Sequence, residues 1–191
     1  MKKLSALILG VILLAGAAHG ILTFYLVDNF EDGTSSKWYA FDRVNVAVAK
    51  VPKIAKRDLV IESGGEYLLE ISGQAADWYA GGIGTSLNVD ARDYSRLQFD
   101  LWGTSAGGKL KVEVFEGDTK WIAELPILGR GATRYSVPFT ALLLDSTATA
   151  EASARVFSRG LSTISRIQFI FVAPAPAGTV DGSLDNIILT Y

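Results

Sequence analysis

The chain has 191 residues, with 18 Lys and Arg against 20 Asp and Glu, a net charge of −2, a single His and no Cys. This balance provides no basic excess to attract nucleic acid, and the absence of Cys excludes disulfides and thiol catalysis. The single His, His19, lies in the region where a leader peptide would be cleaved, so histidine-based acid–base catalysis and a histidine-bearing zinc site are not expected.

The first 20 residues have the layout of a secretory signal peptide. Lys2 and Lys3 precede an apolar run over residues 4–14, and small residues fill positions 15–20. Cleavage after Ala18 and cleavage after Gly20 both fit. The alternative, a membrane anchor, is disfavoured because the apolar run is shorter than the ~20 residues of a spanning helix. We therefore expect a secreted or periplasmic protein without stable membrane insertion after cleavage, in which residues 21–191 form one β-sandwich domain.

Period-two alternation of apolar and polar residues predicts short strands through most of the remaining chain. In chain order they cover residues 21–27, 45–51, 66–72, 78–89, 96–102, 109–115, 121–127, 133–139, 166–172 and 184–191. This alternation is interrupted over residues 140–160, which predicts either a surface loop or a short helix over 148–157. Helical periodicity is scarce and turns are rich in Gly, Asp and Ser, so the fold class is all-β, an antiparallel β-sandwich.

A central stretch contains Trp78, Tyr79 and the glycines Gly81, Gly82 and Gly84. Adjacent strand residues face opposite sides of a sheet, so one of the two aromatic rings is expected in the core. No helix follows the glycines, which argues against a phosphate-binding loop. Close backbone packing or a bulge is the expected reason for them.

The outward faces of three predicted strands, 96–102, 109–115 and 166–172, carry aromatic, amide and charged side chains. If these strands share one sheet, a single polar surface results. Its expected ligand-binding residues are Gln98, Asp100, Trp102, Lys111, Glu113, Phe115 and Gln168. Such a surface is typical of sugar recognition, in which aromatic rings stack on sugar faces while carboxylates and amides bind hydroxyls. The alternative for Trp102 is a secondary core beneath residues 140–160.

Four motifs in order resemble a known family. They are residues 28–33 (DNFEDG), Trp38, residues 78–85 (WYAGGIGT) and residues 184–187 (LDNI). Together they resemble the galactose-binding-like jelly rolls of secreted carbohydrate-binding modules, nearest to the family 11 type, over essentially the whole chain after the leader. The resemblance implies a non-catalytic protein that binds a polysaccharide or oligosaccharide on a concave sheet face.

The resemblance also implies a structural calcium ion where the first and last strands meet. Its implied ligands are Asp28, Glu31 and Asp185, with Asp181 as a further candidate. Calcium takes six to eight oxygen ligands, which an acidic turn beside a terminal Asp-Asn pair can supply. The alternative is that Asp28 is an ordinary turn former and that Asp185 accepts backbone N–H groups.

Two other roles stay open at this point. Asp100 and Glu113 are the only carboxylate pair we nominate for glycoside hydrolysis, and nothing in the sequence marks either with a shifted pKa. The competing function is an envelope or extracellular assembly protein that uses the same scaffold for protein contacts. An open groove with exposed Trp102 would favour glycan, whereas a face covered by residues 140–160 would favour assembly.

Overall fold

The computed structural model describes residues 24–51, 65–103, 107–129, 131–145 and 160–191. The predicted signal peptide and the helix considered at 148–157 lie outside these ranges. Within them, no helix combines the length and the apolar character needed to cross a bilayer.

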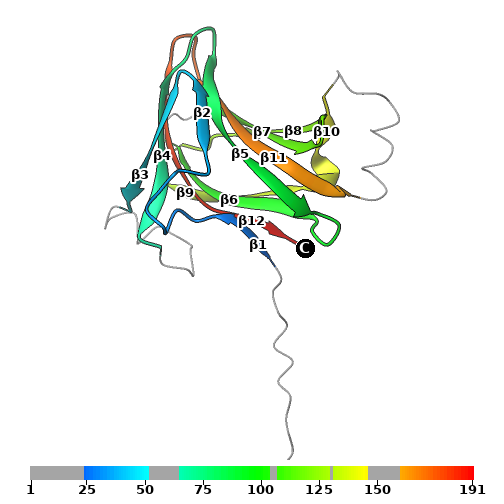
Figure 1. Ribbon diagram of the computed structural model, residues 1–191. Coiled ribbons are helices and arrows are strands. Elements are labelled where there is room, and N and C mark those ends of the chain that lie inside the picture. Colours follow the sequence, from blue (N-terminus) through cyan, green and yellow to red (C-terminus); the bar gives the residue numbers. More distant parts are fainter. Residues whose placement is uncertain (1–23, 52–64, 104–106, 130, 146–159) are drawn as a thin grey trace, which may run out of the picture.

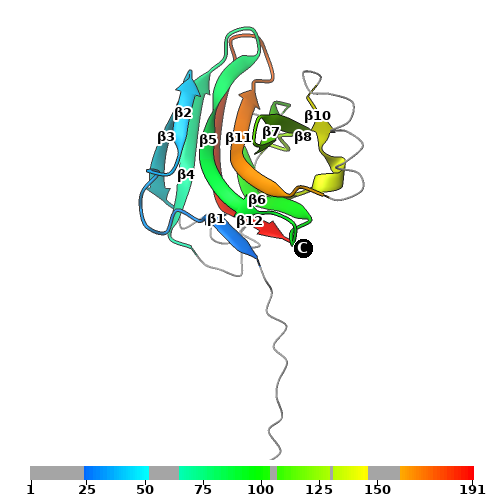
Figure 2. The same ribbon diagram turned by 45° about the vertical axis from the view of Figure 1, so that its right-hand side comes forward.

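Two antiparallel sheets pack face to face, as Figures 1 and 2 show. Sheet A has the order β3-β4-β12-β6-β9, with β1 also paired to β12. Its strands are β1 (Tyr25–Asp28), β3 (Val44–Lys50), β4 (Tyr67–Gln74), β6 (Arg96–Gly103), β9 (Ala132–Pro138) and β12 (Thr179–Thr190). The predicted all-β jelly-roll sandwich is confirmed.

Sheet B has the order β10-β8-β7-β11-β5-β2. Its strands are β2 (Tyr39–Asp42), β5 (Tyr79–Asp90), β7 (Lys109–Glu116), β8 (Thr119–Pro126), β10 (Leu143–Leu144) and β11 (Thr163–Val172). A short 3-10 helix, η2 (Phe139–Ala141), precedes β10. Figure 2 shows β5 and β11 running side by side as curved strands.

The core lies between the inner faces of the two sheets. Phe99 on β6 meets Phe169 on β11 edge to face, with ring centroids 4.9 Å apart, and Trp38 lies 6.0 Å from the same Phe169 ring. Trp121 and Phe171 are also fully buried. Alternation along each strand therefore places one set of side chains inward, which leaves two independent outer faces, one on each sheet.

The first and last strands lie side by side, as the fold class predicts. Tyr25 pairs with Leu189 and Asp28 with Ile187, so the acidic loop after β1 begins beside the end of β12 (Figure 1).

One expectation about sheet membership is wrong. Strand β6 pairs with β12 and β9 in sheet A, whereas β7 and β11 pair with each other in sheet B. The chain crosses from one sheet to the other between β6 and β7. Outward residues of β6 consequently face the opposite side of the molecule from those of β7 and β11, and the seven predicted binding residues do not form one surface.

Candidate functional site

The outer face of sheet B brings together residues from β2, β5, β11 and β7 in cross-strand rows. One row contains Tyr39, Gly84, Gln168 and Glu113. The next contains Phe41, Gly82, Ile170 and Lys111. Four of the predicted residues, Lys111, Glu113, Phe115 and Gln168, therefore do share a face, and the aromatic residues of β2 join them.

Two glycines allow the aromatic rings of β2 to lie across this face. A Cβ atom added at Gly84 would lie 2.5 Å from the Tyr39 ring, and one added at Gly82 would lie 2.6 Å from the Phe41 ring. Gln168 Nε2 donates a hydrogen bond of 2.9 Å to the Tyr39 hydroxyl, which holds the ring over Gly84. The expectation that these glycines serve close packing is confirmed.

Replacing Gly84 with alanine tests this arrangement. The new methyl group is expected to displace the exposed Tyr39 ring and break its hydrogen bond with Gln168, while the flexible ring absorbs most of the strain. In 15N-edited NMR spectra, the side-chain amide signals of Gln168 should move. Unchanged Gln168 signals in a folded Gly84→Ala variant would contradict the described packing.

Trp78 and Tyr79 are both exposed, at 46% and 40%, so the expectation that one ring belongs to the core is wrong. The reason is a tight turn in which Ala76 and Tyr79 exchange backbone hydrogen bonds while Asp77 and Trp78 have φ angles of 50° and 75°. Positive φ is costly for a bulky residue, so Trp78 is held at the turn tip against its backbone preference.

The Tyr79 hydroxyl donates a hydrogen bond to Asp42 Oδ2. Burial, followed by the hydrogen bond and charge of Asp42, raises the pKa of Tyr79 to about 12. Sequence reasoning missed both Tyr39 and Tyr79 as surface rings. The four-residue strand β2 is too short for alternation to assign its faces, and a turn precedes Tyr79.

The strongest charged candidate on this face, Glu113, lies beneath two lysines. It is only 4% exposed, and its Oε1 lies 3.0 Å from Lys111 Nζ and 3.4 Å from Lys120 Nζ. Lys120 Nζ also lies 2.5 Å from Asp145 Oδ2. These carboxylates raise the pKa of Lys120, with Asp145 the larger contributor. Glu113 thus positions cationic donors at the surface, and the lysines are what a ligand would meet.

Phe115 is covered in the same way. The Arg166 guanidinium lies 3.8 Å from the centroid of its ring, a cation–π contact, and Phe115 is buried. Arg166, another residue that sequence reasoning missed, is itself only partly exposed and covers this ring.

Gln98, Asp100 and Trp102 lie on the outer face of sheet A. Gln98 Nε2 donates to Ser136 Oγ at 3.3 Å. Asp100 is buried and accepts two hydrogen bonds of 2.8 Å from Arg134 and one of 3.0 Å from Asn186 Nδ2. Asp100 and Glu113 therefore occupy opposite outer faces, and the nominated carboxylate pair for glycoside hydrolysis is not assembled.

Trp102 is half-buried and borders a groove on sheet A. Most of the segment considered as its cover, residues 146–159, lies outside the described ranges. Its neighbours on the sheet are Ser183 on β12 and Ala132 on β9.

The acidic loop and the last strand bring two of the three implied calcium ligands close together. A Cβ atom added at Gly65 would lie 2.7 Å from Glu31 Oε1 and 3.8 Å from Asp185 Oδ2. Asp28 is held elsewhere: its Oδ1 accepts the N–H groups of Asn29 and Phe30, and its Oδ2 accepts Trp38 Nε1 at 3.0 Å. Asp28 thus acts as a turn former.

Asp185 is 2% exposed and accepts a 2.7 Å hydrogen bond from the N–H of Asn186. Burial, together with the negative charges of Asp100 and Glu31 and against the opposing hydrogen bond from Asn186, raises the pKa of Asp185 to about 7. Among the residues placed by the structure, no three acidic or histidine side chains gather in a metal-holding geometry. Asp181, the further candidate, lines the sheet A groove.

Several solved structures of known proteins have an architecture similar to that of this chain. A family 11 carbohydrate-binding module of the cellulosomal cellulase Lic26A-Cel5E of Clostridium thermocellum aligns with a TM-score of 0.60 at 17% identity, covering 88% of this chain and 95% of that one. The chain has the jelly-roll fold of carbohydrate-binding modules. The predicted resemblance to family 11 is confirmed at the level of fold.

Other carbohydrate-binding modules share this jelly-roll fold. A family 11 module from the same organism, in complex with a β-1,3-1,4-mixed-linked tetrasaccharide, aligns with a TM-score of 0.58 at 18% identity over 87% of this chain and 95% of that one. CBM27-1 of Caldicellulosiruptor saccharolyticus, in complex with mannohexaose, aligns with a TM-score of 0.54 at 14% identity, covering 88% of this chain and 97% of that one. No protein-family profile and no curated protein matches the chain.

Proposed function

We propose that the protein binds a polysaccharide or oligosaccharide, without catalysing its cleavage, on the outer face of sheet B. The observation that carries the proposal is the exposed pair of tyrosine rings, Tyr39 and Tyr79, on a face that also presents an amide and several cations. Exposed aromatic rings stack on the apolar faces of sugars, while amide and cationic donors bind hydroxyl groups.

The spacing of the rings indicates a chain-like ligand. Tyr39 lies opposite Gly84, five positions along β5 from Tyr79. At a rise of about 3.3 Å per residue, the two attachment points are separated by roughly 16 Å. An oligosaccharide would span this distance, whereas a single sugar ring would not. The chain lengths in the two structural neighbours, a tetrasaccharide and mannohexaose, are of this kind.

Isothermal titration calorimetry against mixed-linked β-glucan tetrasaccharide, cellohexaose and mannohexaose tests the proposal. At least one of these ligands should bind the wild-type protein, and Gln168→Ala should bind it more weakly because Tyr39 loses its anchoring hydrogen bond. No binding to any member of a broad glycan array would overturn the proposal and favour the assembly role.

We also propose a structural calcium ion between the acidic loop after β1 and the middle of β12. Glu31 and Asp185 are its side-chain ligands, and backbone carbonyl oxygens would complete the shell, as calcium sites commonly allow. Three backbone hydrogen bonds from Glu66 and Tyr67 to the Glu31 carboxylate fix one of these ligands. Asp28 is left out because its carboxylate caps its own turn and binds the Trp38 indole, whereas Glu31 and Asp185 both lie beside Gly65.

Chelation provides the test. Calcium at 100 times its Kd should raise the free energy of unfolding by about 2.7 kcal/mol relative to protein in EDTA, because only the folded state holds the site. Glu31→Gln should abolish the difference. Asp32→Asn is the matched control, since Asp32 in the same loop only caps Thr34. Identical melting curves with and without calcium would contradict the proposed site.

A further inference from the structure

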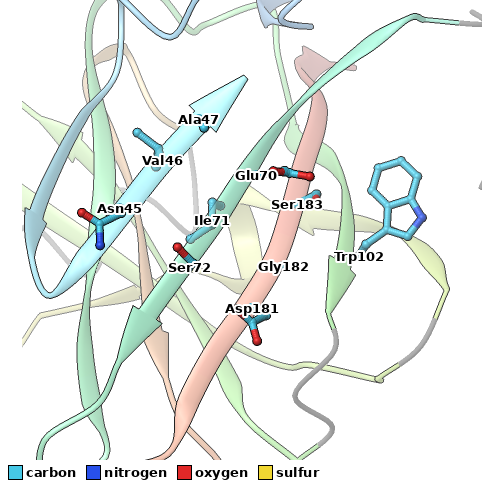
Figure 3. Close-up of a pocket in the computed structure, with 10 residues that line it drawn as sticks. All are labelled: Asn45, Val46, Ala47, Glu70, Ile71, Ser72, Trp102, Asp181, Gly182 and Ser183. Atoms are coloured by element: carbon cyan, nitrogen blue, oxygen red, sulfur yellow. The ribbon is translucent and has the colours of Figure 1, made fainter. Parts of the chain in front are cut away.

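Sheet A carries a groove on the face opposite the proposed glycan surface. It has a volume of about 410 Å³ and crosses four strands, β3, β4, β12 and β6. One cross-strand row supplies Ala47, Glu70, Ser183 and Trp102, and the next supplies Asn45, Ser72 and Asp181. Figure 3 shows Glu70 and Ser183 side by side, with Trp102 beyond them on one side and Ser72 and Asn45 on the other.

The chemistry of this groove is distinct from that of sheet B. Two carboxylates, Glu70 and Asp181, share it with the indole of Trp102, two serine hydroxyls and the Asn45 amide. None of the ten described residues that line it is Lys, Arg or His. A ligand with acidic groups would meet only negative charge here, whereas a neutral polyhydroxyl ligand could donate hydrogen bonds to the carboxylates.

The position of Trp102 supports a ligand-facing role. Its sequence neighbour Leu101 is buried in the core and Gly103 is also buried, while Trp102 points to the other side of the sheet. The indole is half-buried at the border of the groove, so one part of the ring stays available for stacking. An aromatic ring beside hydroxyl-binding carboxylates is a combination suited to a sugar.

We propose that the sheet A groove is a second, separate saccharide site, which takes neutral sugar units through Trp102, Glu70 and Asp181. It does not depend on the proposed function of sheet B, because no residue is shared between the two faces. With both sites active, one molecule would hold two glycan chains on opposite sides, and binding to a polymer would gain from the two linked contacts.

The four tryptophan indole N–H signals in a 15N NMR spectrum report on the two faces separately. Trp102 lies at the groove, Trp78 lies at the turn beside Tyr79, and Trp38 and Trp121 are buried controls. The Trp102 and Trp78 signals are assigned from their loss in the Trp102→Phe and Trp78→Phe variants, which keep an aromatic ring at each position. The probes are cellohexaose and mannohexaose as neutral ligands and an oligogalacturonate as the acidic ligand.

We expect at least one neutral probe to shift the Trp102 signal to saturation, with no shift from the oligogalacturonate. The response should persist in a Tyr39→Ala/Tyr79→Ala variant and weaken about tenfold in Glu70→Gln/Asp181→Asn, which keeps side-chain size but removes charged acceptors. A Trp102 signal that ignores both neutral probes, responds equally to the acidic probe, or loses its response in the tyrosine variant would overturn the second site. A Trp102 response with no change in the Trp78 signal would retain the second site and show that it acts independently of sheet B.

Discussion

Replacing Tyr39 and Tyr79 together with alanine is expected to weaken glycan binding by about 100-fold, because aromatic rings that contact a ligand supply a large share of its binding free energy. Both residues are exposed, at 39% and 40%, so part of each ring is open to a ligand. Calorimetric titration with the tightest-binding glycan measures the effect, and circular dichroism verifies the fold.

The controls separate stacking from hydrogen bonding. Tyr39→Phe retains the ring and loses only the hydroxyl that accepts a hydrogen bond from Gln168, so it should bind with an intermediate affinity. Tyr191→Ala removes an exposed ring at the C-terminus, where it packs against Tyr94 at 6.2 Å, and should bind like wild type. Equal affinities for the double alanine variant and Tyr191→Ala would show that the two rings do not contact the glycan.

Replacing Arg134 with alanine is expected to lower the free energy of unfolding by about 2 kcal/mol, because a buried carboxylate loses its charge partner. Asp100 is 3% exposed and receives both hydrogen bonds of the Arg134 fork. The arginine itself is 44% exposed at its side chain, so solvent screening holds the loss below that of a fully buried pair. Urea denaturation monitored by fluorescence gives the value.

Two variants test the reason for that loss. Asp100→Asn in the Arg134→Ala background removes the unpaired charge and should recover part of the stability. Lys109→Ala breaks an ion pair with Glu124 whose side chains are 61% and 59% exposed, and should change the free energy of unfolding by less than about 0.5 kcal/mol. If Arg134→Ala is no less stable than Lys109→Ala, the Asp100 interaction is not a stabilising one.

Alternation predicts the fold because most strands are long enough to show a period of two. Val112, Phe169 and Leu97, for example, each have another buried apolar residue two positions away on the same strand. It does not predict sheet membership. Strand β6 has the same pattern as β7, yet its partners β12 and β9 are set by long-range pairing that no local period records. The predicted binding residues were therefore divided between two faces.

The burial of polar side chains could not be predicted from the local sequence pattern either. Glu113 and Lys111 both point outward on β7, but only the register with β8 shows that Lys120 covers the carboxylate. Conversely, Trp78 is exposed together with its neighbour Tyr79 because it lies in a turn with positive φ, which a bulky residue disfavours. The glycine positions were the clearest signal, since Gly82 and Gly84 lie directly under the rings of Phe41 and Tyr39.

The most direct test is a backbone chemical-shift titration with the mixed-linked β-glucan tetrasaccharide, or with whichever array glycan binds tightest. We predict saturable shifts along β2, β5, β11 and β7, greatest near Tyr39, Gln168 and Tyr79. A tightly binding glycan that leaves those four strands unperturbed would contradict glycan recognition by sheet B.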